Sequence, residues 1–277
     1  MYKALSPGNI GHSVTFKDAA KIGAEEGFKG FWFDIEGDSK ISVSETKELL
    51  AETGLIAGGF GLPVEFRKDE QVFNDDFAKL EGYARYAADV GMKRCATYIM
   101  PFSEIYTFEE NFELHRSRLK KCCEVFNEYG IVLGLEFIGP PKVRRGKKYE
   151  FVYNLDQMLE LCDAIGTGNC GLLLDIWHWD LAGQSLEDFK KITNDQVALV
   201  HIMDAPEGIA PEEQDDSPRR LPGETGVLRI AEFFEGLNSI GYDGPVVAEP
   251  FVKALSEMSF KQAVETVITA INSVWPE

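Results

Sequence analysis

Short apolar runs alternate with longer amphipathic segments along the whole chain. Continuous apolar runs of this length are typical of strands that are buried on both faces of a parallel sheet. They predict strands at residues 3–6, 30–35, 55–61, 94–100, 131–136, 171–175, 197–203 and 245–249. Segments with helical spacing of apolar residues follow, and they predict helices near residues 16–26, 44–52, 74–90, 108–129, 154–165, 185–192, 227–240 and 259–274.

Polar caps and glycines mark the ends of several predicted helices. Ser44 begins the second helix as its N-cap, and Gly54 follows its end. Asn74 or Asp75 is expected to begin the third helix, and Gly130 ends the fourth. The helices therefore have defined boundaries and fill the intervals between the strands.

Eight strand–helix units in succession predict an α/β fold with a closed parallel sheet. Right-handed βαβ connections repeated eight times give a single (β/α)8 TIM barrel. The 277 residues of the chain match the roughly 250 residues of that fold, so we expect one domain over residues 1–277. An open doubly wound sheet is the alternative, but it usually has a G-x-G-x-x-G loop after its first strand. Residues 6–11 lack that pattern.

Four consecutive strands in the second half of the chain end in residues that can bind a divalent metal. Each alone is also explained by a buried salt bridge or a satisfied core histidine. The C-terminal ends of barrel strands meet at one mouth, however, so the four side chains would converge. Three carboxylates and one imidazole suit Mn²⁺, Mg²⁺ or Zn²⁺. The predicted ligands are Glu136, Asp175, His201 and Glu249.

Residues just after the strand ending at Asp175 are candidate substrate contacts. His178 would lie in the following loop, above the mouth, where it could bind a substrate oxygen. The alternative is a solvent-exposed loop histidine. Trp177 and Trp179 flank it and could form the wall of a sugar-sized pocket, or pack against the next helix.

The long segment after His201 contributes two more candidates. Asp204 could orient an imidazole or position the substrate. Arg219 could reach an oxyanion at the metal, or it could pair with the acidic run at residues 212–216. A basic cluster at residues 142–148 is either a solvated loop or a lid that faces the substrate.

Composition excludes several classes of function. The net charge of −18 repels phosphate backbones, so we expect no nucleic-acid partner. No apolar stretch approaches the ~20 residues of a membrane span, and the N-terminus lacks the apolar region of a signal peptide. The five cysteines show no C-x-x-C spacing. They therefore predict reduced thiols in a cytoplasmic protein.

The order of the candidate residues resembles the xylose-isomerase-like barrel superfamily of sugar isomerases and epimerases. The shared order is Glu136, Asp-x-x-His at 175–178, His201, Arg-x-x-Pro-Gly at 219–223 and Glu-Pro-Phe at 249–251. The segments that look most like the inosose isomerases of inositol catabolism are residues 135–139, 174–178 and 241–251. The tagatose and psicose 3-epimerases are close behind.

The resemblance implies a role for each of these residues. It implies that one divalent ion is bound by Glu136, Asp175, His201 and Glu249. It also implies that substrate oxygens are bound by His178 and Arg219. In the epimerases the two metal-bound glutamates move the protons, which makes Glu136 and Glu249 the expected catalytic residues here.

The chain departs from the family pattern at three places. Trp32 stands where relatives often carry a glutamate, and Asp34, on the same face of the strand, could replace it. Lys142 stands where the epimerases often have an acidic residue. The Pro-Gly-Glu-Gly turn is lengthened at residues 222–226. These differences concern the substrate and leave the metal ligands unchanged.

The sequence therefore predicts a metal-dependent isomerase or epimerase of a keto-sugar or keto-inositol, acting through a metal-stabilised enediolate. Loss of a β-hydroxyl from the same intermediate would give a dehydratase of the inosose type. A non-catalytic or partner-dependent sugar-binding subunit is an alternative. The abasic-site DNA endonucleases of the superfamily use a histidine-rich zinc cluster, and four histidines and an acidic surface argue against that function. A homo-oligomer is one option that the relatives imply.

Overall fold

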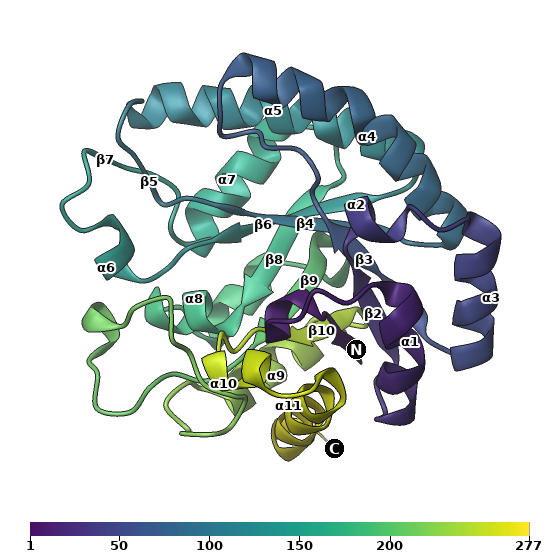
Figure 1. Cartoon of the computed structure of the whole chain (residues 1–277). Helices are drawn as coiled ribbons and strands as arrows, with labels where there is room; N and C mark the ends of the chain where they lie inside the picture. The colour runs from purple at the N-terminus through teal and green to yellow at the C-terminus, as the bar shows by residue number, and fades with distance from the viewer. Residues whose placement is uncertain (277) are drawn as a thin grey trace.

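The structure, a computed structural model, describes residues 1–276. Eight parallel strands close into a barrel in the hydrogen-bonded order β1-β10-β9-β8-β6-β4-β3-β2 (Figure 1). Their bounds are β1 Tyr2–Leu5, β2 Gly30–Phe33, β3 Ile56–Gly61, β4 Arg94–Ile99, β6 Val132–Phe137, β8 Cys170–Asp175, β9 Val197–Ile202 and β10 Pro245–Ala248. Strands that are consecutive in the sequence are neighbours around the ring, so the predicted (β/α)8 barrel is confirmed.

Helices cover the outside of the barrel (Figure 1). The long ones are α1 Phe16–Glu25, α3 Val43–Thr53, α4 Glu70–Val90, α5 Phe108–Glu128, α7 Leu155–Ile165, α9 Ile230–Ser239 and α11 Phe260–Val274. Shorter elements lie in the connections: α2 Ile35–Asp38, α6 Pro141–Arg144, α8 Ile176–Leu181, α10 Lys253–Glu257, the 3₁₀ helices η1 Gly8–Ile10, η2 Leu186–Lys191, η3 Asn194–Gln196 and η4 Pro211–Glu213, and the small antiparallel pair β5 Phe102–Ser103 and β7 Tyr149–Glu150. Within residues 1–276, none of the helices has the length and apolar character needed to cross a bilayer.

Two predicted helix starts are wrong because other side chains cap these helices. Ser42, not Ser44, is the N-cap of α3, and its hydroxyl accepts a backbone N–H of the first turn. Asp69 does the same for α4, which therefore begins about one turn before the expected Asn74 or Asp75. In both cases the earlier polar residue satisfies an otherwise unpaired N–H group.

The connection after β8 also differs from expectation. We expected a loop, but α8 starts directly at Ile176 because Asp175 caps it. Its Oδ1 accepts the N–H groups of Trp177 and His178 at 2.6 and 3.3 Å. The α-helix expected at residues 185–192 is the 3₁₀ helix η2.

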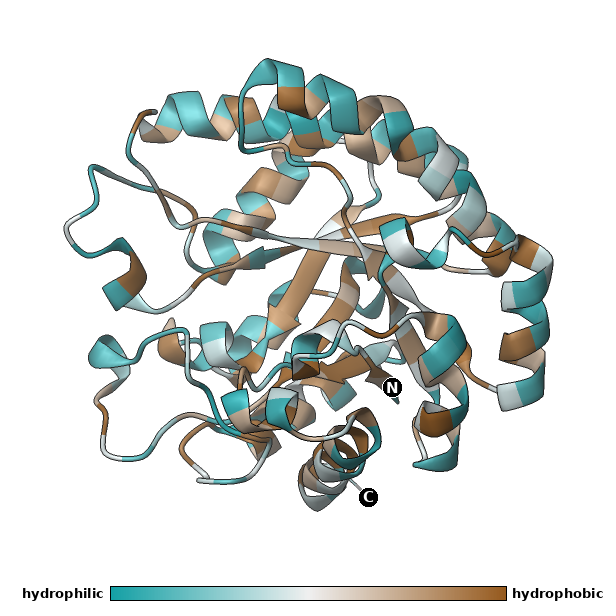
Figure 2. Cartoon of the chain, in the orientation of Figure 1, coloured by the Kyte–Doolittle hydropathy of each residue, from teal (hydrophilic) through white to brown (hydrophobic). Residues whose placement is uncertain are grey.

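Two apolar layers hold the barrel together. One lies between the sheet and the helices, where the helices turn their apolar faces inward (Figure 2). The other fills the barrel interior and consists of Ala4, Trp32, Ala96, Leu173, Leu199 and Val247. Because side chains alternate along a strand, the residue two positions beyond each interior residue faces the mouth. Leu173 and Leu199 are thus followed at the mouth by Asp175 and His201.

Candidate metal centre

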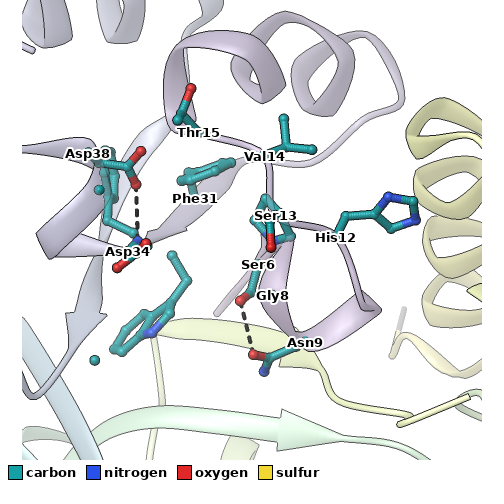
Figure 3. Close-up of a pocket in the computed structure, with 15 residues that line it drawn as sticks. Ser6, Gly8, Asn9, His12, Ser13, Val14, Thr15, Phe31, Asp34 and Asp38 are labelled. Carbon is teal, nitrogen blue, oxygen red and sulfur yellow. Dashed lines mark hydrogen bonds between the residues drawn. The ribbon is translucent and has the colours of Figure 1, made fainter. Parts of the chain in front are cut away.

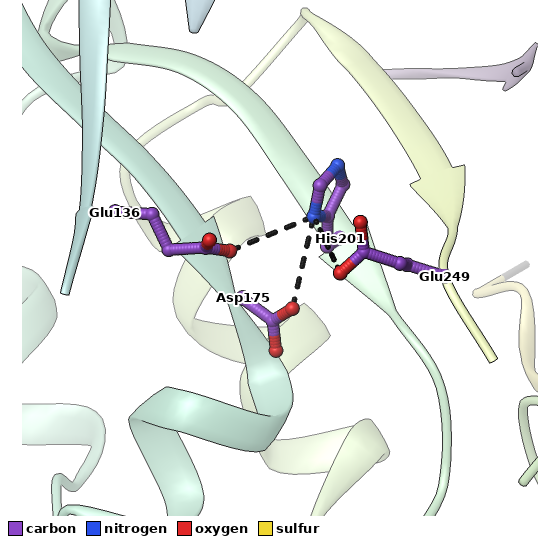
Figure 4. A group of neighbouring side chains, drawn as sticks. All are labelled: Glu136, Asp175, His201 and Glu249. Carbon is purple, nitrogen blue, oxygen red and sulfur yellow. Dashed lines mark ion pairs between the residues drawn. The ribbon is translucent and has the colours of Figure 1, made fainter. Parts of the chain in front are cut away.

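All four predicted ligands meet at the C-terminal mouth of the barrel (Figure 4). Glu136 and Asp175 lie on β6 and β8, His201 lies on β9, and Glu249 directly follows β10. Each contributes one ligand atom, and these atoms all lie within 4.8 Å of one another. The strand ends thus place together four residues that are far apart in the sequence.

His201 Nδ1 lies at the centre of this group. It is 3.6 Å from Glu136 Oε1, 3.7 Å from Asp175 Oδ2 and 3.5 Å from Glu249 Oε2. Among the described residues, neither His201 Nδ1 nor Glu136 Oε1 has a hydrogen-bond partner, although both atoms are buried. Unpartnered buried polar atoms are costly. A divalent ion held by three oxygens and one nitrogen would satisfy both atoms, so the residues fit a metal.

The electrostatics of the group also favour a bound cation. Burial raises the pKa of Glu136 to about 8, and the charges of Asp175 and Glu249 add to this effect. Burial acts in the same direction on Asp175, but the Arg219 guanidinium holds the pKa of that carboxyl well below its ordinary value. The surrounding carboxylates raise the pKa of His201 well above its usual range, against the effect of burial. The raised pKa values of Glu136 and His201 show that these side chains attract protons, and a bound cation would supply the same positive charge.

Arg219 is almost completely buried and uses all its N–H groups within the protein. Nη1 donates to Asp175 Oδ2 and Glu249 Oε2, each at 3.0 Å. Nη2 donates to Asp216 Oδ1 at 2.7 Å and lies 3.3 Å from His178 Nε2, and Nε donates to the Asp216 carbonyl. Because a guanidinium has five N–H groups, contact with a substrate oxygen requires one of these bonds to break. That contact stays a prediction.

Of the two roles predicted for Arg219, the structure shows the pairing with the acidic run, while contact with an oxyanion at the metal stays a prediction. The arginine pairs with the acidic run through Asp216. It also contacts the cluster of Glu136, Asp175, His201 and Glu249, called the metal group below. Its guanidinium is within cation–π distance of two aromatic rings, with Cζ 5.3 Å from the ring centre of Trp177 and 4.6 Å from that of Phe251. Phe251 adopts a left-handed backbone with φ of 46°, which is uncommon for a bulky residue.

His178 and Trp177 lie in the first turn of α8. The solvent-exposed alternative for His178 is wrong, because the side chain is 1% exposed. It lines the cavity beside Glu136 and Glu249, and burial lowers its pKa to about 4, so the ring is neutral near pH 7. Trp177 is fully buried and is not among the residues that line this cavity. The substrate contact predicted for Trp177 therefore has no open surface in this structure.

The imidazole contact predicted for Asp204 is absent from the described structure, and its role in positioning the substrate stays a prediction. Its carboxylate contacts no imidazole and instead accepts five backbone N–H groups at 2.7–3.1 Å, those of Ala205, Thr225, Gly226, Val227 and Leu228. Its own backbone pairs with Arg220. Asp204 therefore fixes the two ends of loop 205–228, from which Arg219 reaches the metal group.

Several cavities open at the mouth among the described residues. The ligand-side cavity has a volume of about 390 Å³ and is lined by Tyr98, Glu136, His178, Arg219 and Glu249, among others. A second cavity of about 470 Å³ lies beside the ends of β1, β2 and β3 (Figure 3). Its polar lining includes Ser6, Asn9, Asp34 and Asp38.

The basic cluster contacts the acidic loop. Lys142 Nζ lies 2.8 Å from Asp215 Oδ2, and Arg145 Nη1 lies 2.7 Å from Glu213 Oε1. These ion pairs join α6 to the segment containing η4. The cluster is therefore not a freely solvated loop. Val143, within it, lines the same cavity as Glu136 and Glu249, so the lid that faces the substrate stays a prediction.

Sequence reasoning missed Asn9. It lies in η1, just after β1, and its side-chain Nδ2 donates to Glu249 Oε1 at 3.2 Å. The same rule that found the ligands, polar residues at strand ends, could have drawn attention to it. The loop around it, Gly8 to Gly11, contains no other sequence pattern that indicates a functional role.

The model of a known family, described as xylose isomerase-like TIM barrel, matches residues 16–270. The chain belongs to this family. Among curated relatives in the comparison, an inosose isomerase of Halalkalibacterium halodurans is 28% identical over 159 residues, which are 54% of this chain and 53% of the relative. A D-psicose 3-epimerase of Enterocloster bolteae is 25% identical over 136 residues, 48% of this chain and 38% of the relative. The match thus spans about half or less of these xylose isomerase-like relatives.

A solved structure is similar to this chain over nearly its whole length. The IOLI protein, solved with a bound zinc atom, has a TM-score of 0.81 and 19% identity, and the match covers 99% of this chain and 98% of that one. At this identity the likeness establishes the barrel fold. The relatives named in the comparisons are sugar isomerases and epimerases.

Proposed function

We propose that this protein is a divalent-metal-dependent isomerase or epimerase of a keto-sugar or keto-inositol. The observation that carries the proposal is the convergence of Glu136, Asp175, His201 and Glu249, with His201 Nδ1 facing all three carboxylates. The names of the relatives, inosose isomerase and D-psicose 3-epimerase, support the reaction class.

The arrangement of two carboxylates supports a role for both in proton transfer. Glu136 and Glu249 approach His201 from opposite directions (Figure 4), and both line the ligand-side cavity. One glutamate removes a proton from the carbon next to the substrate carbonyl, and the other returns a proton to the resulting enediolate. The bound metal supplies Lewis-acid polarisation of the carbonyl and its neighbouring hydroxyl.

The outcome depends on where the proton returns. Return to the opposite face of the same carbon gives epimerisation, and return to the neighbouring carbon gives isomerisation. Loss of a β-hydroxyl instead would give dehydration. Since His178 is neutral and lines the cavity, we propose that its ring binds a substrate hydroxyl next to the reacting carbon.

The donor set supports Mn²⁺, Mg²⁺ or Zn²⁺ as the ion. Zn²⁺ has the additional support of the zinc atom in the structurally similar IOLI protein. We also propose a cytoplasmic location, which the five free cysteines support. The net charge of −18 supports a small neutral substrate over a nucleic acid.

Incubation of the purified protein with inososes and ketohexoses in D₂O, followed by NMR, tests the proposal. We expect deuterium uptake at the carbon beside the carbonyl, lost after chelation and restored by adding one of the three ions. Inversion, carbonyl migration or water loss then identifies the reaction. Undiminished activity of metal-free protein would refute the metal dependence. Exchange seen only with a second polypeptide would favour the partner-dependent alternative.

A further inference from the structure

The two glutamates of the metal group differ in what holds them. Glu249 is bonded at both oxygens: Oε2 accepts from Arg219 Nη1 at 3.0 Å, and Oε1 accepts from Asn9 Nδ2 at 3.2 Å. Glu136 Oε1 has no hydrogen-bond partner among the described residues. The orientation of one carboxylate is therefore fixed by the protein, whereas the other depends on what binds beside it.

The orientation of the Asn9 amide is itself determined by a neighbour. Ser6 Oγ donates to Asn9 Oδ1 at 3.1 Å, so the amide oxygen faces Ser6 and the NH₂ group faces Glu249 (Figure 3 shows the Ser6–Asn9 pair). A flipped amide would put two acceptor oxygens, from Asn9 and Glu249, against each other. The same Nδ2 lies 3.5 Å from His201 Nε2.

The local backbone places Asn9 where it can do this. Asn9 is the middle residue of the single 3₁₀ turn η1, which follows β1 and ends at Gly11 with a left-handed φ of 81°. A Cβ at Gly11 would lie 2.9 Å from the Ser256 Cβ. The turn is thus fixed by close packing against α10, in the segment just after Glu249.

A glutamate that both binds a metal and moves a proton must divide these tasks between its oxygens. The terminal torsion of a carboxylate is broad and two-fold, so the two oxygens exchange places unless a partner prevents it. In Glu249, Oε2 faces His201 Nδ1 and the other predicted ligands, and Oε1 faces Asn9.

We propose that Asn9 is a positioning residue that holds Glu249 Oε1 in place for proton transfer while Oε2 faces the metal. The inference rests on the proposed function and adds a residue from the first strand–helix connection to it. Asn9 does not bind the metal in this scheme. Its loss is expected to slow proton transfer more than it weakens substrate or metal binding.

The test compares Asn9→Leu, which keeps the approximate size but removes the N–H donors, with Asn9→Ala and with Asn238→Leu as a matched control. Asn238 is exposed on α9 and makes no side-chain hydrogen bond in the described structure. The substrate is the one that the wild-type protein exchanges fastest in D₂O. The measurements are kcat, KM, the isotope effect with substrate deuterated at the reacting carbon, and the Mn²⁺ Kd by calorimetry.

For both Asn9 variants we expect kcat to fall by about 10- to 100-fold, as for other residues that orient metal ligands. The isotope effect on kcat should rise, while KM, the Mn²⁺ Kd and the thermal midpoint stay near the values of the wild type and of Asn238→Leu. A kcat within twofold of wild type would overturn the proposal. So would a loss of Mn²⁺ affinity that matches the loss of kcat, because Asn9 would then act on metal binding. If the wild-type protein itself shows no metal-dependent exchange, the proposed function fails first, and this inference falls with it.

Discussion

The two halves of the barrel mouth follow one geometric rule but carry different chemistry. In the ligand half, the ends of β6, β8, β9 and β10 present the metal group, with Arg219 packed against it. In the open half, the ends of β1, β2 and β3 line a cavity of about 470 Å³. Its acidic residues, Asp34 and Asp38, have no cation within ion-pair distance in the described structure.

The alternation of side chains along the strands determines which residues reach the mouth in both halves. The chemical type of those residues determines what each half can bind. Asp175, His201 and Glu249 in one half and Asp34 in the other reach the mouth because each lies two residues beyond a side chain of the interior layer. Converging carboxylates are tolerated in the ligand half because Arg219 and His201 offset their charge.

The largest expected effect is the loss of proton exchange when a glutamate of the ligand half is neutralised. Glu136→Gln and Glu249→Gln should each lower the rate of deuterium uptake by at least about 10²–10⁴-fold, because general acid–base catalysis is lost. NMR in D₂O measures the rate. Asp34→Asn, in the open half, is the matched control for metal binding and should leave the Mn²⁺ Kd unchanged. Normal exchange in both glutamate variants would show that neither residue moves the proton.

The next largest effect should come from the anchor of the ligand half. Asp204→Asn puts a donor group among five backbone donors, so we expect the free energy of unfolding to fall by about 2–3 kcal/mol. Urea unfolding measures this, and trypsin should cleave more rapidly after Arg219 and Arg220. Asp215→Asn removes only an exposed ion pair with Lys142 and should cost less than about 1 kcal/mol. Equal costs for the two variants would mean that Asp204 does not anchor the loop.

An effect of similar size should separate the buried carboxylates of the two halves by pH. Asp38 accepts two backbone N–H groups, from Phe16 and Asp34, at 2.7 and 3.0 Å, yet burial without a cation raises its pKa to about 6. A raised carboxyl pKa stabilises the folded state below the unfolded pKa of about 4, and this contribution is lost as the pH rises through 6.

Urea unfolding with chelator present, at pH 4 and pH 7, measures this contribution. Asp38→Asn cannot ionise, so the stability of wild type relative to the variant should fall by about 2–3 kcal/mol between these pH values. The same difference at both pH values would place the pKa of Asp38 near its ordinary value. Asp175, whose pKa Arg219 holds down, has no such loss in this window.

The smallest effect concerns the glycines that shape the open half. Gly59 has φ of 149°, and a Cβ there would lie 2.4 Å from the Arg94 carbonyl oxygen and 2.5 Å from the Trp32 ring. Gly59→Ala should therefore destabilise the fold by about 1–3 kcal/mol, as measured by urea unfolding. Gly61→Ala, on the same strand but with open space around its Cβ, should change stability by less than about 1 kcal/mol. A neutral Gly59→Ala would mean that both the Arg94 backbone and the Trp32 ring can shift to make room for the added Cβ.

The barrel and its four metal-binding candidates could be predicted because both follow from short, regular patterns. Buried parallel strands are continuous apolar runs, and their ends meet by topology alone. Asp175 illustrates the limit of such reasoning. The pattern placed it at the mouth but did not reveal that its Oδ1 would cap α8 and draw His178 into a buried helix.

The rest of the site depends on contacts that no local pattern encodes. The role of Asp204 is set by residues 225–228, and Arg219 reaches the ligands from an irregular loop. Asn9 contacts a residue 240 positions away. Such contacts are fixed by the packing of loops at the mouth, where the sequence has no periodicity to read.

The most direct test of the account is a crystal structure of the protein soaked with Mn²⁺, with the ion located by its anomalous scattering. We predict one peak at the mouth, at about 2.0–2.3 Å from His201 Nδ1 and from one oxygen each of Glu136, Asp175 and Glu249. The absence of a peak at saturating Mn²⁺, or a peak bound by other residues, would contradict the central claim that four consecutive strand ends form a single metal site.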